Sequence, residues 1–187
     1  MLERFPQSQP AHAGLVISDA LGLAPVDTLA RAIFRGREAA EALASAAFGM
    51  AFPAINRASG ESATRAALRL GPDEVLLFMP ETESEAVFAN LNAALAGVAH
   101  SLVDITHRQQ GFRLEGPSAA RILNAGCPLD LGLAAFPLGM ATRSLFFKAE
   151  ITLWRLGEHA FHIECGRSFV PYLVMMLENA MKTRDYP

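Results

Sequence analysis

Apolar and polar residues along this chain predict short strands alternating with helices. Alternating side chains over 28–35 and 65–70 are typical of half-exposed strands, each ended by a glycine. A buried strand is predicted over 75–79. The alanine-rich segment 37–48 is a predicted helix that ends at Gly49. Thr82 and Glu85 have the spacing of a capping box, so a second helix is expected over 83–96.

The remaining chain continues in the same way. Strands are expected over 102–105 and 111–115, a short helix from Gly116 to about Asn124–Gly126, and strands over 142–148, 150–155 and 160–164. Ser168 is a predicted N-cap for a final helix over 169–182, with Pro171 in its first turn.

The order of these elements is strand–helix–strand–strand–helix–strand, followed by a partial second copy. We therefore expect an α+β fold with two ferredoxin-like βαββαβ-type halves, about 27–115 and 116–187. No exact sequence repeat accompanies the duplication. Residues 1–26 contain three prolines and no periodicity, and are interpreted as an N-terminal arm without a core of its own.

Composition suggests a chain that buries surface against another protein. The 16 basic and 19 acidic residues give a net charge of −3, which excludes a strongly basic nucleic-acid binder. Hydrophobic residues make up 51% and charged residues 19%. No segment has the roughly 18 apolar residues of a membrane span, and the N-terminus lacks a signal-peptide pattern. The two cysteines, 38 apart, favour a reducing, cytoplasmic compartment.

Candidate chemistry is sparse, and each pattern has two interpretations. Cys127 is either a loop nucleophile, with His100 or His107 as its base, or a packed thiol. His159, His162 and Cys165 have metal-ligand spacing on a helix, but diverge on the strand predicted here. Asp104 either belongs to an acid–base cluster or accepts bonds from loop amides. No phosphate-binding glycine motif is present.

Several motifs indicate a specific family. They are RLGPDEVLLFMP (69–80), VDITHRQQGFRLEGPSAARIL, NAGCPLDL, TRSLFFKAEITLWRLGEHAFHIE and RSFVPYL, the last four within 101–180. Together they resemble the gamma subunit of bacterial heterotetrameric sarcosine oxidases. The resemblance covers somewhat more than half of the chain, and GCPLDL and RSFVPYL are its most specific parts.

This resemblance implies a fold similar to the folate-binding domain of glycine-cleavage aminomethyltransferases, and an assembly with alpha, beta and delta subunits. It places FAD, covalent FMN, NAD and tetrahydrofolate in the alpha and beta subunits, and no cofactor, metal or catalytic group in gamma. The assembled enzyme would oxidatively demethylate sarcosine to glycine, form hydrogen peroxide and pass the one-carbon unit to tetrahydrofolate.

The same comparison argues against catalysis by this chain. Aminomethyltransferases typically carry a GG stretch and an Asp pair in the hairpin that here reads KAEITL (148–153), where Glu150 is the only carboxylate. Three alternatives remain: a free-standing folate-dependent aminomethyltransferase-like protein, a subunit of a related N-methyl amino acid oxidase, and a general interaction domain.

Two short segments are the candidate site. We expect them to serve partner docking or fold integrity, the alternative being that they hold only the chain's own turns. They are Gly126, Cys127, Pro128, Leu129 and Asp130, and Arg167, Ser168 and Phe169.

Overall fold

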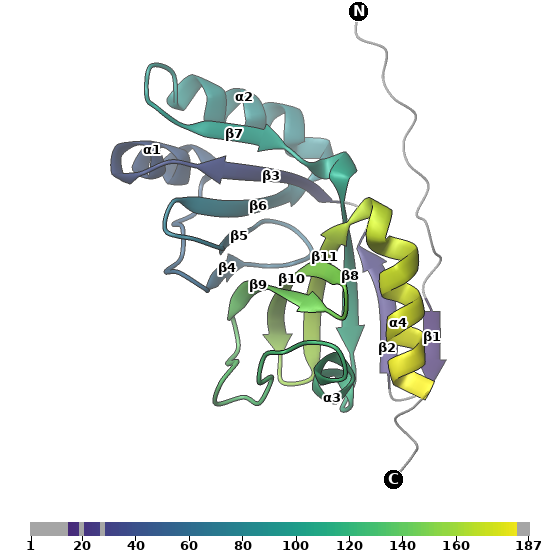
Figure 1. Ribbon diagram of the computed structural model, residues 1–187. Helices are drawn as coiled ribbons and strands as arrows, with labels where there is room; N and C mark the ends of the chain where they lie inside the picture. Colours follow the sequence, from purple (N-terminus) through teal and green to yellow (C-terminus); the bar gives the residue numbers. More distant parts are fainter. Residues whose placement is uncertain (1–14, 19–20, 27–28, 183–187) are drawn as a thin grey trace, which may run out of the picture.

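The computed structural model describes residues 15–18, 21–26 and 29–182, and their strands form two antiparallel sheets (Figure 1). The first sheet, sheet A, has the order β1-β2-β8-β11-β10-β9. Its strands are β1 (Leu15–Ser18), β2 (Leu21–Val26), β8 (Gln109–Glu115), β9 (Ala141–Phe146), β10 (Ala149–Gly157) and β11 (Ala160–Gly166). The second, sheet B, has the order β4-β5-β6-β3-β7. Its strands are β3 (Leu29–Arg35), β4 (Ala58–Gly60), β5 (Ala66–Arg69), β6 (Glu74–Pro80) and β7 (Ser101–Asp104).

The sheets face each other and the helices cover their outer faces. Helices α1 (Glu38–Phe48) and α2 (Ser84–Ala94) form one core with sheet B. Helices α3 (Ala119–Asn124) and α4 (Val170–Lys182) form another with sheet A. A third core, which includes Leu29, Phe78 and Trp154, joins the two sheets. Three one-turn helices, η1 (Glu81–Glu83), η2 (Thr106–Arg108) and η3 (Arg167–Phe169), complete the elements.

The two halves repeat one topology, so the predicted α+β fold with ferredoxin-like halves is confirmed. Sheet B places the strands of the unit β3-α1-β5-β6-α2-β7 in the order β5-β6-β3-β7, with β4 added outside β5. Sheet A repeats this order as β10-β11-β8-β2, with β9 added outside β10. The last strand of the second half is therefore β2, which comes from the start of the chain.

The expectation that residues 1–26 form an arm without a core is wrong for residues 21–26. Strand β2 pairs with β8 over five positions, and Leu21 and Leu23 are buried in the core under α3 and α4. Pro25 lies beyond the part of β2 that pairs with β1, so its missing N–H costs no ladder bond there. The first 14 residues of the expected arm lie outside the described residues.

The boundary between the halves also moves. The predicted boundary at 115 places β8 in the first half, but β8 pairs with β2 and β11 in sheet A. The change of sheet falls in η2, between β7 and β8. The first half is continuous in sequence, from β3 to β7, whereas the second half is not, because β2 precedes the whole first unit.

Local predictions hold where the signal is strictly local. Helix α1 ends at Gly49, whose φ of 75° is the expected left-handed cap. The prediction of a capping box is wrong. The one-turn helix η1 precedes α2, and the Ser84 hydroxyl donates to the Glu81 carbonyl (2.7 Å). Strand β3 is buried on both faces rather than half-exposed, because helices cover one face and sheet A the other. No helix of the described residues is long and apolar enough to cross a membrane.

Candidate functional site

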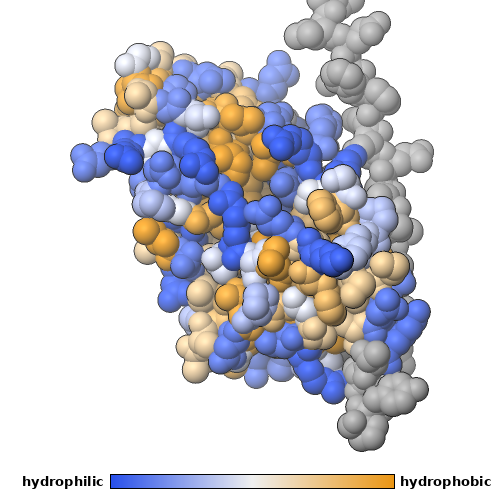
Figure 2. Space-filling view, in the orientation of Figure 1, coloured by the Kyte–Doolittle hydropathy of each residue, from blue (hydrophilic) through white to orange (hydrophobic). Residues whose placement is uncertain are grey.

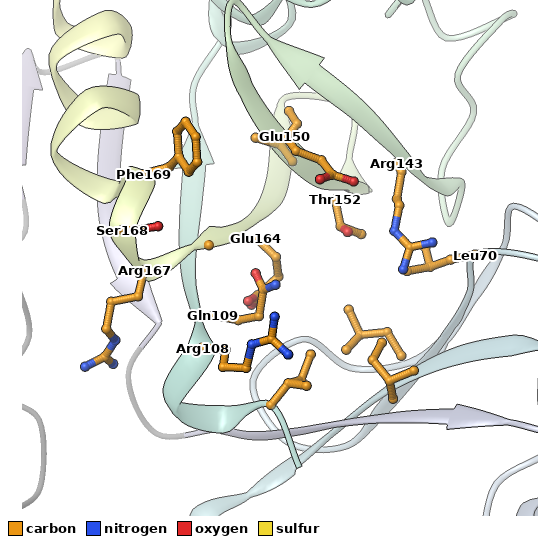
Figure 3. Close-up of a pocket in the computed structure, with 15 residues that line it drawn as sticks. Leu70, Arg108, Gln109, Arg143, Glu150, Thr152, Glu164, Arg167, Ser168 and Phe169 are labelled. Carbon is orange, nitrogen blue, oxygen red and sulfur yellow. The ribbon is translucent and has the colours of Figure 1, made fainter. Parts of the chain in front are cut away.

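A cavity of about 590 Å³ opens between the two sheets (Figure 3). Sheet B and the turn after β7 contribute an apolar side formed by Ile33, Leu70, Leu76 and Ile105. Sheet A contributes polar side chains, and the segment around η3 forms one end. The charged and polar lining residues are Arg108, Gln109, Arg143, Glu150, Thr152, Glu164, Arg167 and Ser168.

Strand alternation explains why charged residues meet inside this interface. Side chains at every second position of a strand share one face. In β11, Phe161 and Ile163 pack in the core under α4, so His162 and Glu164 face sheet B. In β3, Ala30 and Ala32 pack under α1 and α2, which leaves Arg31 facing sheet A.

Arg31 and Glu164 form a buried, bidentate ion pair between the sheets. Arg31 Nε lies 2.8 Å from Glu164 Oε2, and Arg31 Nη2 lies 3.1 Å from Oε1. The guanidinium also donates to the carbonyls of Leu29 (2.7 Å) and Val26 (3.1 Å). Arg31 therefore has its charge balanced and most of its N–H groups bonded, which a buried cation requires.

His162 completes the cluster from the same strand as Glu164. Its Nε2 lies 2.7 Å from Glu164 Oε1, whereas its buried Nδ1 has no hydrogen-bond partner. The geometry suits the tautomer with the proton on Nε2. The imidazole is packed against the rings of Phe78 (centroids 5.2 Å apart) and Trp154 (6.1 Å).

The charges around Glu164 keep it ionised. Burial alone would raise the pKa of this carboxyl, but Arg31 and the hydrogen bond from His162 outweigh burial and hold the pKa below its usual value. A carboxylate that is already bonded to a guanidinium and an imidazole is poorly suited to take a proton from a substrate. Its role is to link the sheets.

Gly111 provides the space for this pair. It lies opposite Glu164 in the β8–β11 ladder. A Cβ atom at this position would lie 2.5 Å from Glu164 Oε1 and 2.8 Å from Arg31 Nη2. A Cβ atom here would therefore displace the ion pair, and glycine leaves it in place.

A second ion pair crosses the sheets at the cavity mouth. Glu74 of β6 is buried, and its carboxylate binds both Arg35 of β3 and Arg143 of β9. The charge of Arg143 is therefore paired with a carboxylate of its own chain. Of the charged residues lining the cavity, Arg108 and Glu150 are exposed and form no ion pair with the described residues.

Few titratable groups that are free to act in catalysis line this cavity among the described residues. Glu150 and Thr152 project into it from β10, and the Arg167 guanidinium is turned away (Figure 3). Glu150 is the only lining carboxylate that is not already bonded, and it is not paired with a second titratable group among the described residues. General acid–base catalysis needs a group whose pKa is tuned by such a neighbour.

The first predicted segment forms the turn after α3. Cys127 is buried, with its Sγ 3.3 Å from the Ser144 hydroxyl, so the packing interpretation of this thiol is confirmed. Asp130 accepts the Gly132 N–H (2.8 Å), and the Leu129 carbonyl accepts the Asn124 amide (2.8 Å). Pro128 is exposed. Gly126 lies under the Phe147 ring, where a Cβ atom would overlap the ring.

The second segment forms η3 at the start of α4 and lines the cavity. Ser168 and Phe169 are exposed at its rim. Arg167 is half-buried, and its Nε has no hydrogen-bond partner. The structure therefore places the two segments at different sites: the first beside the β9–β10 hairpin and the second at the cavity.

The structure also places the other residues that the sequence singled out. Asp104 accepts the Thr106 N–H (2.8 Å), as the loop-amide interpretation predicts. His159 lies in an exposed turn, whereas His162 is buried between the sheets. In the last helix, Met175 is exposed and Met181 is buried.

Sequence reasoning missed the cluster at the sheet interface. His162 and Glu164 are two apart on a predicted strand, and they therefore share a face. That two-residue spacing is the signal that could have identified the pair, whereas residues three positions from His162 point to the other face. Arg31 gave no signal, because a charged residue in an alternating strand normally faces solvent.

Comparisons with known proteins agree with this fold. Residues 35–183 match the model of the "Sarcosine oxidase, gamma subunit family". The chain is 33% identical over 138 residues to the sarcosine oxidase gamma subunit of Corynebacterium sp. (strain U-96), covering 73% of this chain and 66% of that protein. It is 32% identical over 144 residues to the gamma subunit of an Arthrobacter species, covering 76% of this chain and 70% of that one.

Two solved structures have a similar fold. The heterotetrameric sarcosine oxidase of Corynebacterium sp. U-96, in complex with pyrrole 2-carboxylate, contains a chain that matches with a TM-score of 0.84 and 29% identity, covering 94% of this chain and 90% of that one. The glycine cleavage system aminomethyltransferase T of Bartonella henselae matches with a TM-score of 0.65 and 20% identity, covering 89% of this chain and 46% of that one. The second match supports the shared fold alone.

Proposed function

This chain belongs to the sarcosine oxidase gamma subunit family, and from that premise we propose that it is the non-catalytic gamma subunit of a heterotetrameric sarcosine oxidase. The family inferred from the sequence motifs is thereby confirmed. The observation that carries the proposal is the match to a chain of a solved heterotetrameric sarcosine oxidase over nine-tenths of both chains. The chain spans about two thirds of the length of its curated relatives, so activity and partners are part of the proposal.

In this proposal the chain contributes structure rather than chemistry. It assembles with alpha, beta and delta subunits in the cytoplasm, and FAD, FMN, NAD and tetrahydrofolate are held by the partners. The arrangement around the cavity supports this role. Glu164 and Glu74 are bonded to arginines, and Glu150 forms no ion pair with the described residues.

The test is a mild purification of the tagged chain from its native cells. We expect two larger subunits and one small subunit to be recovered with it, together with flavin absorption bands and sarcosine-dependent hydrogen peroxide. A colourless chain recovered alone would overturn the proposal. Recovery of flavin-bearing partners that oxidise another N-methyl amino acid but not sarcosine would support the subunit role. The proposed substrate, sarcosine, would then be wrong.

One measurement on the isolated chain separates the proposal from a free-standing transferase. We expect no tetrahydrofolate binding by calorimetry, because the chain lacks the acidic pair of the transferases. Saturable binding that the change Glu150→Gln abolishes would instead favour an aminomethyltransferase-like role for this chain.

A further inference from the structure

Sheet A ends in β9, the longest of the end strands. The two sheets end in β1, β9, β4 and β7. Strand β9 has six residues, whereas β1 and β7 have four and β4 has three. A long end strand offers backbone groups that can bond a strand of another chain, and proteins usually shorten or block such edges.

Hydrogen bonds at the start of the β9–β10 pair establish which groups of β9 face outward. Arg155 of β10 donates to the Met140 carbonyl (2.9 Å) and accepts the Gly139 N–H (3.0 Å), so its backbone groups point towards β9. The direction alternates along an antiparallel pair. Leu153 and Ile151, which come two and four positions before Arg155, therefore bond the residues opposite them, Thr142 and Ser144.

The outward positions of this edge are Ala141, Arg143, Leu145 and, in the following turn, Phe147. Both ends are bonded within the chain: the Ala141 N–H donates to the Asn56 carbonyl (3.1 Å), and the Phe147 N–H to the Gly126 carbonyl (2.9 Å). These two bonds confirm the direction assigned by alternation. Between them, no backbone group of the described residues bonds the outward groups of Arg143 and Leu145; a side-chain hydroxyl, that of Thr142, lies 3.5 Å from the Arg143 carbonyl.

The turn beside this gap holds an exposed phenylalanine in a strained conformation. Phe147 has a φ of 51°, at the first position of a two-residue hairpin loop where glycine, asparagine or aspartate is normal. Its side chain is 40% exposed, and that of Leu145 is 46% exposed. The Phe147 ring packs against Gly126 and Phe146 on one side, which leaves its exposed part beside the gap. Strained conformations of this kind cluster at functional sites.

We propose that the outer edge of β9 docks an extended segment of a partner subunit, which adds a strand to sheet A and covers Leu145 and Phe147. This inference rests on the proposed function. The occupant is an extended chain because the unbonded groups are those of a strand edge, which only another backbone matches in spacing. Apolar contact alone would not define the site, since the face of the molecule seen in Figure 2 shows apolar areas divided by polar side chains.

Proline and side-chain variants test the two parts of this contact. Leu145→Pro removes the outward N–H and leaves the bonds to β10 in place, whereas Leu145→Ala keeps the N–H and removes the side chain. In the purification from native cells, we expect at least ten-fold less partner recovery with Leu145→Pro, and a smaller loss with Leu145→Ala. Circular dichroism of both isolated variants should match the wild-type chain.

A matched change on another end strand serves as the control. Val103 of β7 is 45% exposed, close to the value for Leu145. We expect Leu145→Asp to abolish partner recovery and Val103→Asp to leave it unchanged. Wild-type recovery of partners by Leu145→Pro would overturn the docking proposal and leave the proposed function intact, whereas failure of the wild-type chain to recover partners would overturn both.

Amide exchange measured on the complex reads the edge directly. In the isolated chain the Arg143 and Leu145 amides should exchange at least ten-fold faster than those of Thr142 and Ser144. In the complex we expect the Arg143 and Leu145 amides to become protected. If the Arg143 and Leu145 amides exchange equally fast in the complex and in the isolated chain, strand addition by a partner is contradicted. It is also contradicted if Leu145→Pro prevents self-association of the chain but leaves partner recovery unchanged.

Discussion

Arg31 and Glu164 are 133 positions apart in the chain, yet they form a bidentate ion pair within the interface between the two sheets. Each is at most 4% exposed in its side chain. Arg31 lies in β3 of the first half and Glu164 in β11 of the second. The pair therefore joins the facing sides of the two sheets. His162 hydrogen-bonds Glu164, and Gly111, which has no side chain, leaves room for the pair.

Removing both partners of this pair should cost less than the sum of the costs of removing each one alone. Arg31→Met or Glu164→Gln leaves a buried group without its partner, so we expect a loss of about 3–5 kcal/mol in the free energy of unfolding for each single change. The double variant should lose less than the sum of the two. Urea unfolding of the four proteins measures the coupling. Additive losses would mean that the two side chains do not interact.

Gly111→Ala should displace the ion pair. A Cβ atom there would lie 2.5 Å from Glu164 Oε1, so we expect a clear loss of stability, about 1–3 kcal/mol, as for overpacked cores. Gly22→Ala is the matched control, because Gly22 also lies in a strand of sheet A and a Cβ atom there has no neighbour within 4 Å. Thermal unfolding of both variants checks the prediction. Equal effects of the two changes would contradict the role assigned to Gly111.

The Glu164 contribution should disappear in acid. Its pKa is held below the ordinary value of 4.5. The folded state therefore favours the ionised form, and the stabilisation is fully present above the ordinary pKa and lost as pH falls through the lowered one. We expect the stability difference between wild type and Glu164→Gln to shrink as pH is lowered from neutral to below 4.5. A constant difference, measured by urea unfolding at each pH, would contradict this.

The sequence allowed the fold to be predicted where the signal is local or periodic. Strand β3 was found from alternation, and α1 from alanine content and Gly49. What covers each face was not predictable in this way, because alternation gives the same pattern whether Arg31 faces water or a second sheet. The candidate segments beginning at Gly126 and Arg167 were found through motif resemblance, and whether they dock a partner stays a prediction.

Strand β2 could not be found from the sequence for a related reason. It includes Gly22 and Pro25, which weaken any strand pattern, and its main partner β8 begins 83 positions after it ends (109 − 26). Its pairing depends on contacts that no local rule describes.

The same strand gives a direct test of how the second half is completed. Leu23 is buried, lies opposite Leu114 of β8 and packs in the core under α4. Leu23→Ala should therefore lower the free energy of unfolding by about 2–5 kcal/mol, as for other buried leucines. Ala24, its exposed neighbour on the same strand, is the control, and Ala24→Ser should change stability by less than about 0.5 kcal/mol. A Leu23→Ala protein as stable as wild type would mean that β2 is not part of the cooperative fold, and the second half would then have to be stable with only four of its strands. The expected large loss would instead make the start of the chain as necessary to the second half as the residues that follow β8.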